Sequence, residues 1–417
     1  MSQKKVIIVA PFWDQPPHVG IYRVQRYIHW FKNQGFNVII LKSDVIDNLN
    51  TNENVLTISV ADRRLKLSKI LYSFSKKFTF PFLHLLWNKF IYVISVPDEY
   101  TFWGSRVIKN KTVLENIHDA NIIISTSPPN SSIVLAKNLS KKFKIPLIVD
   151  MRDGWLDEPL RNYLRKNGIR KRIEERLERE VLESANKIIV TSDSWKDLLC
   201  ERYPHLRENI TVITNAYPEI TLPKPGIKKR KVIRLIYAGN YLGDNRMSRL
   251  EALLIAFDPH KITPQSQVQL DLYGKLGIQG KKTLNMFSQY NNSEFIKLNI
   301  LEPVSRMQLL KEMMNSDGLI LPSISKSAIP SKMFEYILTE KPILAITELN
   351  SAVWNLGLNI PQVCLFEVLG NDLNYDSISK YLRMCSLGGY STSIPKEYSV
   401  RELEKKFTDV LHSLDLN

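Results

Sequence analysis

VIIVAPFWDQPPHVGIYRVQRYIHWFKNQGFNVIIL, residues 6–41, carries the pattern from which the architecture is first predicted. It opens with an apolar, β-branched run, Val6–Ala10, and closes with a second one, Val38–Leu41. Between them, apolar side chains recur at helical spacing over residues 21–31, and Gly35 follows as a helix stop. Strand, helix and strand in this order are typical of a βαβ unit in a parallel sheet.

The same alternation continues along the chain. In the first half we expect further strands at Asn121–Ser125, Pro146–Asp150, Lys187–Thr191 and Ile210–Ile213. After the basic, proline-containing stretch Leu222–Lys231, a second series is expected at Val232–Tyr237, Val268–Leu272, Phe295–Leu298, Gly318–Leu321 and Pro342–Ile346. The sequence therefore predicts an α/β protein with two Rossmann-like doubly wound domains, residues 1–215 and 216–395. Because ligands of such sheets bind beyond the carboxyl ends of the strands, we expect the two domains to face a cleft that holds the site.

Composition excludes several classes of protein. With 417 residues, 44% hydrophobic and 24% charged, the chain is neither a disordered polymer, nor a collagen, nor a disulfide-stapled miniprotein. The net charge of +15, concentrated in the first 200 residues, indicates an anionic partner. The three cysteines, Cys200, Cys364 and Cys385, show no CxxC spacing, which argues against a zinc ribbon or a disulfide framework. Since Val6–Ala10 is too short for the core of a signal peptide, we expect a cytoplasmic protein.

Residues 62–111 interrupt the alternation and are rich in Lys and Arg. Within them, apolar side chains from Leu67 to Phe78 share one helical face, with Lys69 and Lys76 opposite. This basic amphipathic insertion is predicted to lie at an anionic membrane surface. A helix packed on the first domain with a solvated basic face explains the pattern equally well.

The most informative stretch is residues 328–338, AIPSKMFEYIL. Pro330 and Ser331 indicate a helix start, with Ser331 as a candidate N-cap. Lys332 then falls in the first turn, where the helix dipole disfavours a cation unless an anion such as phosphate binds there. Glu335, one turn in, is a candidate acceptor for sugar hydroxyls. The alternative is an ordinary surface helix with a mismatched lysine.

A second candidate loop follows the strand at Tyr237, where Gly239 and Asn240 let the backbone approach a ligand closely and Arg246 adds positive charge. Taken alone, this is an ordinary strand-to-turn junction. The sequence has no GxGxxG and no Walker-type loop, so neither NAD binding nor P-loop hydrolysis has support from a motif.

In the first domain, Asp150, Arg152 and Asp153 lie at the carboxyl end of a predicted strand, where a general base or a substrate-binding group would lie. A local structural pair between the arginine and an aspartate explains this stretch nearly as well. His18, just beyond the first strand, is a further catalytic candidate, although a lone histidine is more often structural. The sequence contains no Asp-x-Asp, HExxH or paired His/Cys spacing, so we expect no metal.

These motifs together resemble the GT-B glycosyltransferases of glycosyltransferase family 4. In chain order they are Ser127–Pro129, Arg152–Trp155, Tyr237–Asn240 and Pro330–Tyr336. The stretch Val96–Trp103 also resembles a segment of the bacterial surface-polysaccharide branch. The likeness extends over nearly the whole chain.

The resemblance implies that the first domain binds the acceptor and the second a nucleotide-diphosphate sugar. It implies ribose contacts for Glu335 and diphosphate contacts for Ser331 and Lys332, with Gly239 and Asn240 lining the phosphate side. It also implies a retaining reaction and a C-terminal helix, Val400–Leu414, that packs back on the first domain.

The sequence departs from the family pattern twice. Ser327 stands where the family has the first glutamate of a Glu-x7-Glu motif, which leaves the contacts to the donor's sugar ring open. On the acceptor side, the usual Gly-Gly loop is reduced to Val19-Gly20.

The sequence therefore predicts a glycosyltransferase that moves a sugar to a glycan or lipid-linked acceptor in surface-polysaccharide biosynthesis, without cofactor or metal. In this reading Asp153, His18 and Lys332 are catalytic, Arg246 assists at the diphosphate, and Gly20 and Arg152 lie on the acceptor side. Two alternatives stay open: a sugar-nucleotide epimerase of the same fold, and a non-catalytic protein that binds a membrane or nucleic acid. No nucleic-acid-binding motif is present, so nucleic acid is not an expected partner.

Overall fold

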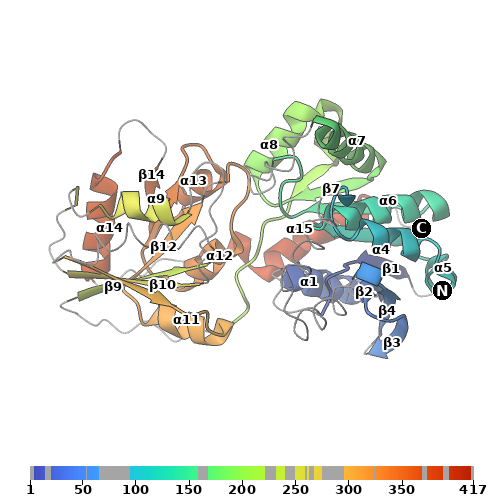
Figure 1. The fold of residues 1–417 in the computed structure, drawn as a ribbon, viewed down its shortest axis with the longest axis horizontal. Coiled ribbons are helices and arrows are strands. Elements are labelled where there is room, and N and C mark those ends of the chain that lie inside the picture. The colour runs from blue at the N-terminus through green and yellow to red at the C-terminus, as the bar shows by residue number, and fades with distance from the viewer. Residues whose placement is uncertain are drawn as a thin grey trace, which may run out of the picture. The chain divides into compact units, whose positions relative to one another are not determined.

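The computed structural model divides the chain into two compact units (Figure 1). Unit 1 comprises Met1–Thr191, Lys196–Ile213 and Glu404–Asn417, and unit 2 comprises Ser192–Trp195 and Thr214–Leu403. The structure describes residues 4–14, 20–52, 54–64, 94–157, 168–220, 232–239, 249–258, 261–262, 267–274, 295–323, 325–368, 373–387 and 394–414.

Unit 1 is built on an eight-stranded sheet. In spatial order the strands are β3 (Asn48–Asn52), β4 (Val55–Ala61), β2 (Asn37–Asp44), β1 (Lys5–Val9), β5 (Ile122–Ser127), β6 (Leu147–Met151), β7 (Lys187–Val190) and β8 (Ile210–Val212). All neighbours pair in parallel except β3 and β4, which are antiparallel. The central strands β1 and β5 are almost wholly buried, which explains their continuous apolar runs, since helices cover both faces of a parallel sheet.

The helices of unit 1 follow the strands in the βαβ pattern. They are α1 (Gly20–Asn33), α4 (Thr101–Val107), α5 (Lys111–Ile117), α6 (Asn130–Phe143), α7 (Gly168–Ser184), α8 (Asp193–Arg202, whose first residues belong to unit 2), the 3-10 turn η3 (Pro204–Asn209) and α15 (Val400–His412). Among the described helices, none is long and apolar enough to span a bilayer.

The C-terminal helix α15 packs on α1. The ring of Phe407 lies 5.3 Å from that of Tyr27 and 5.2 Å from those of Trp30 and Phe31, measured between centroids. At the rim, the Asn33 amide donates to Glu404 at 2.7 Å. An aromatic cluster therefore joins the end of the chain to its first helix.

Unit 2 has a six-stranded sheet in which every neighbouring pair is parallel. Its order is β11 (Ile296–Leu301), β10 (Gln267–Tyr273), β9 (Val232–Ala238), β12 (Gly318–Ser323), β13 (Ile343–Thr347) and β14 (Val363–Glu367). Reading outward from β9, the chain first builds strands on one side and then returns to build on the other. This doubly wound order places the topological switch point between β9 and β12.

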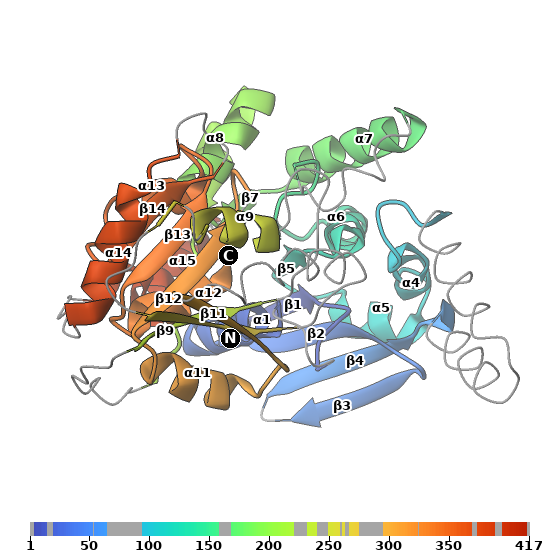
Figure 2. The ribbon, with the colours of Figure 1, turned by 60° about the vertical axis from the view of Figure 1, so that its left-hand side comes forward.

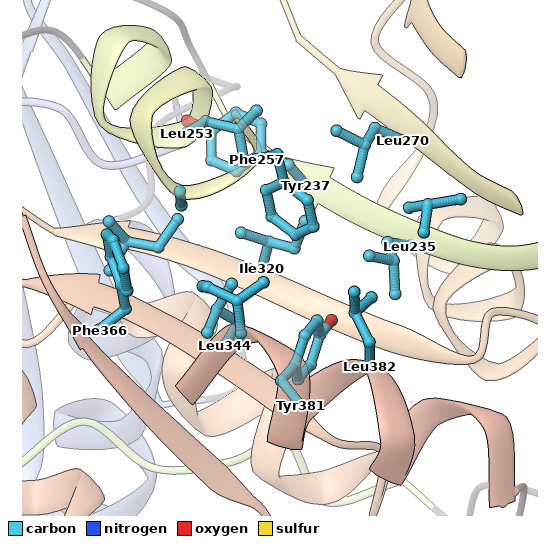
Figure 3. Close-up of a cluster of buried hydrophobic side chains, with 14 of the residues drawn as sticks. Leu235, Tyr237, Leu253, Phe257, Leu270, Ile320, Leu344, Phe366, Tyr381 and Leu382 are labelled. Atoms are coloured by element: carbon cyan, nitrogen blue, oxygen red, sulfur yellow. The ribbon is translucent and has the colours of Figure 1, made fainter. Parts of the chain in front are cut away.

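Two apolar layers cover the faces of this sheet. On one face, α9 (Arg249–Ala256) and α14 (Asp376–Leu387) pack on β-strand side chains that include Tyr237 and Ile320 (Figure 3). On the other face, α11 (Arg306–Met314), α12 (Ser331–Leu338) and α13 (Ala352–Gly357) form the second layer. The 3-10 turn η4 (Lys396–Tyr398) touches α12 through the rings of Tyr398 and Phe334. The predicted α/β class with two Rossmann-like parallel sheets is confirmed.

Three strands were not predicted. β3 has the polar sequence NLNTN and is exposed throughout, so it carries no apolar signal. β4 was not predicted, although Val55–Ala61 is largely β-branched, because it directly precedes the basic stretch that interrupts the alternation. β14 lies at the edge of unit 2, where its alternating burial gives a weaker pattern than the central strands have.

The insertion predicted at 62–111 is not a single surface segment. Its end, from residue 94 onward, belongs to the packed unit: Trp103 of α4 is buried, and its indole N–H donates to the Val60 carbonyl at 3.0 Å. The predicted amphipathic helix from Leu67 to Phe78 lies outside the described residues. Figure 2 shows α4 and α5 beside β4.

Candidate functional site

The strands β9 and β12 part at their carboxyl ends. Their pairing stops at Tyr237 and Ile320, whereas β12 continues to pair with β13 as far as Ser323. The last residue of β9, Ala238, thus lies beside a strand to which it is no longer bonded. This opening at the switch point is where ligands of doubly wound sheets bind.

The helix α12 starts beyond the end of β12, and its N-terminus carries no side-chain cap within the described structure. The prediction that Ser331 is the N-cap is wrong by one residue: Pro330 holds that position and Ser331 is the first helical residue. Proline has no polar side chain, so it cannot accept from the first-turn N–H groups. The Met333 N–H donates to the Pro330 carbonyl at 2.9 Å, so the earlier N–H groups of the first turn and the positive end of the helix dipole are the features suited to an anion.

The apolar face of α12 is buried. Met333, Phe334 and Ile337 are fully buried, and Leu338 nearly so. This face packs under β12 and β13 in the second apolar layer, which fixes the direction of the helix axis. Lys332 is consequently turned toward the end of β9, where its ammonium donates to the Ala238 carbonyl.

Gly239 follows β9, and a side chain there would displace two neighbouring side-chain ends. A Cβ atom there would lie 2.7 Å from the Tyr237 hydroxyl and 2.8 Å from the Lys332 ammonium. Its N–H donates to the Tyr273 carbonyl at 2.8 Å, which extends the β9–β10 ladder by one residue. The structure thus brings together Gly239 and Lys332, two residues that the sequence nominated separately.

Glu335 is paired with Arg306, a residue that the sequence analysis missed. The Arg306 Nε donates to Glu335 Oε1 at 2.8 Å, and its Nη2 lies 2.6 Å from the same oxygen. Arg306 opens α11 directly after Ser305, which caps that helix by accepting from the Gln308 N–H at 3.3 Å. Nothing in the sequence around Arg306 indicates its partner, because that partner lies on another helix.

Three further predicted site residues cannot be placed in the structure, and a fourth position is buried. Asn240 and Arg246 lie outside the described residues, as does His18 in unit 1. Ser327 is buried, and its backbone carbonyl accepts from the Ser192 hydroxyl. The position that is glutamate in the resembled family is therefore enclosed by protein here.

In unit 1, Asp150 at the end of β6 is fully buried and bound to Arg23 of α1. The Arg23 Nε and Nη2 donate to its two oxygens at 2.7 and 2.8 Å, and Nη2 also donates to the Ile213 carbonyl at 3.0 Å. Burial by itself lowers the pKa of Arg23, but the Asp150 carboxylate raises this pKa above the ordinary value. A buried carboxylate with a bidentate cation has a structural role, so we do not expect Asp150 to act as a base.

Arg152 and Asp153 follow on the next turn. Their N–H groups donate to the Ser127 carbonyl at 3.0 and 3.4 Å, which ties the loop to the end of β5. The predicted pair between them is loose, with 3.5 Å from Arg152 Nε to Asp153 Oδ2. The Asp153 side chain is 39% exposed, whereas Arg152 is largely buried and its Nη1 finds no partner among the described residues. Gly20, the first residue of α1, is buried.

The described residues contain no group of three or more His, Cys, Asp or Glu side chains placed to hold a metal ion. The prediction that no metal takes part remains a prediction.

The sequence of residues 89–218 matches the model of Glycosyltransferase Family 4, over less than half of the chain. No curated protein sequence matches significantly. Three solved structures illustrate the likeness of fold, each over nearly the full length of both chains. TarM has a TM-score of 0.63 and 12% sequence identity, and the match covers 98% of this chain and 99% of that chain. Anabaena HepE in complex with UDP and glucose has a TM-score of 0.57 and 12% identity, over 99% of this chain and 100% of that chain. Trehalose 6-phosphate synthase from Burkholderia multivorans has a TM-score of 0.60 and 10% identity, over 99% of this chain and 97% of that chain. The predicted GT-B fold is confirmed, and the family match together with this fold supports the predicted enzyme class, a glycosyltransferase.

Replacing Asp150 with Asn should lower the free energy of unfolding by about 3–5 kcal/mol, because it leaves the buried Arg23 guanidinium without a counter-ion. Denaturant unfolding of both proteins measures the difference. The matched control is Asp153→Asn, which alters a half-exposed carboxylate three residues away and should change stability by about 0.5 kcal/mol or less. Equal effects of the two substitutions would contradict the structural role of Asp150.

Proposed function

We propose that the protein transfers a sugar from a nucleotide-diphosphate sugar, bound at the carboxyl edge of unit 2, to a glycan or lipid-linked acceptor bound by unit 1. The observation that carries this proposal is the position of Lys332. Its ammonium lies beside Gly239, at the uncapped start of α12 and at the switch point of a doubly wound sheet.

Three features of this edge suit a diphosphate. The first-turn N–H groups of α12 offer oriented donors, and the Lys332 ammonium adds a full positive charge. At Gly239, the absent side chain lets backbone come close to the phosphate. An anion here would also offset the cost of placing a lysine at the positive end of a helix.

Glu335 suits the ribose of the nucleotide. Both contacts from Arg306 fall on Oε1, so this oxygen is fixed and sets the plane of the carboxylate. A carboxylate accepts through both oxygens, and vicinal hydroxyls donate to such a group at close range. Arg306 in this arrangement pairs with Glu335 and orients its carboxylate.

The chemistry proposed is electrostatic. As the bond from the sugar to the diphosphate breaks, negative charge grows on the leaving oxygens, and Lys332 with the α12 N-terminus stabilises it in place. On the acceptor side, the exposed carboxylate of Asp153 is the candidate to receive the acceptor's proton, with His18 as a second candidate and Gly20 and Arg152 near the acceptor. The resemblance to family 4 favours retention of configuration. The complex of HepE with UDP and glucose supports a nucleotide sugar as the donor.

Replacing Lys332 with Ala should reduce turnover by about 100- to 1,000-fold, because one preorganised cation at the leaving group is lost. Release of nucleoside diphosphate from a panel of nucleotide sugars measures the effect. Lys326→Ala is the matched control, since this lysine lies in the same unit with a side chain that is 67% exposed, and its loss should leave turnover unchanged. Near-normal turnover of Lys332→Ala would refute the phosphate site. Conversion of the donor to another nucleotide sugar without an acceptor would instead indicate an epimerase.

Replacing Glu335 with Gln should weaken donor binding about tenfold, because a charged acceptor of ribose hydroxyls becomes a neutral one. Calorimetric titration with the nucleoside diphosphate measures the change. Glu312→Gln is the control: it alters another helix carboxylate of unit 2 that is paired with an arginine, Arg234, at 2.8 Å. If both variants bind the nucleotide like the parent, Glu335 has no part in the site.

We further propose that the enzyme works in surface-polysaccharide biosynthesis. It would bind peripherally at the inner face of a membrane, through the basic residues between 62 and 93.

Exchanging Lys69 and Lys76 for Glu should abolish sedimentation with anionic phosphatidylserine vesicles, because attraction to the surface scales with the number of cations. Exchange of the exposed Lys141 and Lys142 of α6 for Glu makes the same change of net charge elsewhere. Equal binding by both variants would rule out the segment as the anchor.

A further inference from the structure

Two side chains of α12 hold the last peptide groups of β9. Lys332 and Tyr336 are four residues apart and therefore lie on the same side of the helix. The Lys332 ammonium donates to the Ala238 carbonyl, and the Tyr336 hydroxyl accepts from the Ala238 N–H at 3.2 Å. Both backbone groups of one residue are thus bonded to one helix.

The ladder explains why this residue needs partners from outside the sheet. In a parallel sheet, the N–H and C=O of one residue point to the same neighbouring strand, and those of the next residue point to the other. The Gly239 N–H points to β10, where it meets the Tyr273 carbonyl. Ala238 therefore points to the side of β12, whose pairing with β9 has already ended at Ile320. Side chains of α12 replace the missing strand.

We propose that Tyr336 is a positioning residue for the donor site, and this rests on the proposed function. Its phenol oxygen fixes the Ala238 peptide, the Ala238 carbonyl holds the Lys332 ammonium, and Gly239 next along the chain lies beside that ammonium. Tyr336 is fully buried, so it acts through Ala238 and touches no ligand itself.

The surroundings of Tyr336 favour this role. Burial raises the pKa of its phenol above the ordinary value, so the group remains protonated at neutral pH. Loss of the hydroxyl would leave the Ala238 N–H buried without an acceptor, and a buried, unsatisfied amide is costly. The end of β9 would shift to recover a partner, and Lys332 would lose its fixed anchor.

Tyr381 offers a matched control in the same sheet. It is also fully buried, and its hydroxyl donates to the Leu319 carbonyl of β12 at 2.9 Å. It belongs to α14 on the other face and bonds to the strand before the opening (Figure 3). Tyr381→Phe therefore removes a buried hydrogen bond between a tyrosine hydroxyl and a strand without touching Ala238, although here the hydroxyl is the donor.

The test compares Tyr336→Phe and Tyr381→Phe by two readouts. The first is amide hydrogen exchange at Ala238 and Gly239, which requires no ligand, and we expect it to be about tenfold faster in Tyr336→Phe alone. The second is the affinity for nucleoside diphosphate, which should fall about tenfold in Tyr336→Phe and stay unchanged in Tyr381→Phe. In a Lys332→Ala background the effect of Tyr336→Phe on affinity should shrink, because both residues act through one peptide.

The outcomes separate this proposal from the proposed function. Unchanged exchange at Ala238 in Tyr336→Phe overturns the positioning role whatever the protein binds. Faster exchange with unchanged nucleotide affinity also overturns it, but leaves the proposed function intact. Equal losses of affinity in the two tyrosine variants reduce the effect to general destabilisation. If the parent protein binds no nucleoside diphosphate but exchange responds as expected, the proposed function fails and Tyr336 still holds the end of β9.

Discussion

The hydrogen-bonding demand of a central parallel strand governs this structure. β1 and β9 are buried among neighbours on both sides, and each of their peptide groups must find a partner because no water reaches them. Along the strand, the neighbours meet this demand. Where the neighbours diverge at the carboxyl end, other groups must do so, and in unit 2 the side chains of Lys332 and Tyr336 take over. Polar side chains thus enter unit 2 at the point where the pairing of β9 with β12 ends.

The N-termini of two corresponding helices, one in each unit, differ in the charge of the side chain beside them. Both α6 and α12 follow the switch-point strand, and both have proline at the N-cap, which gives no side-chain cap. In unit 1, the Asp98 carboxylate supplies the anion, accepting from the Ser131 N–H at 2.9 Å. In unit 2, the first turn of α12 carries a cation, Lys332, instead. The protein therefore provides its own anion at α6, and the contrast with α12 agrees with the proposed phosphate-bearing donor in unit 2.

Much of the fold could be predicted because burial on both faces leaves a strong trace in the sequence. The strands around β1 and β9 are continuous apolar runs, and the apolar face of α12 repeats at helical spacing. The three missed strands lie at or next to the sheet edges, where the demand for apolar residues is weaker, and β3 needs none. The error at Ser331 has a different origin. A serine at a helix start indicates an N-cap. Here the preceding Pro330 has the non-helical backbone conformation that an N-cap requires, so Pro330 takes that position.

The candidate site shows where single-sequence reasoning ends. Gly239 and Lys332 were each found from local rules, because a glycine after a strand and a lysine in a first helical turn break ordinary patterns. Arg306 and Tyr336 break no pattern: one is a helix-start arginine and the other an apolar-face aromatic. Their roles come from partners on other elements, Glu335 and Ala238, and pairing of that kind follows only from the packing of α11 and α12 on the sheet. The residues proposed to contact the ligand therefore leave a local signal in the sequence, whereas the residues proposed to position them look like ordinary helix residues.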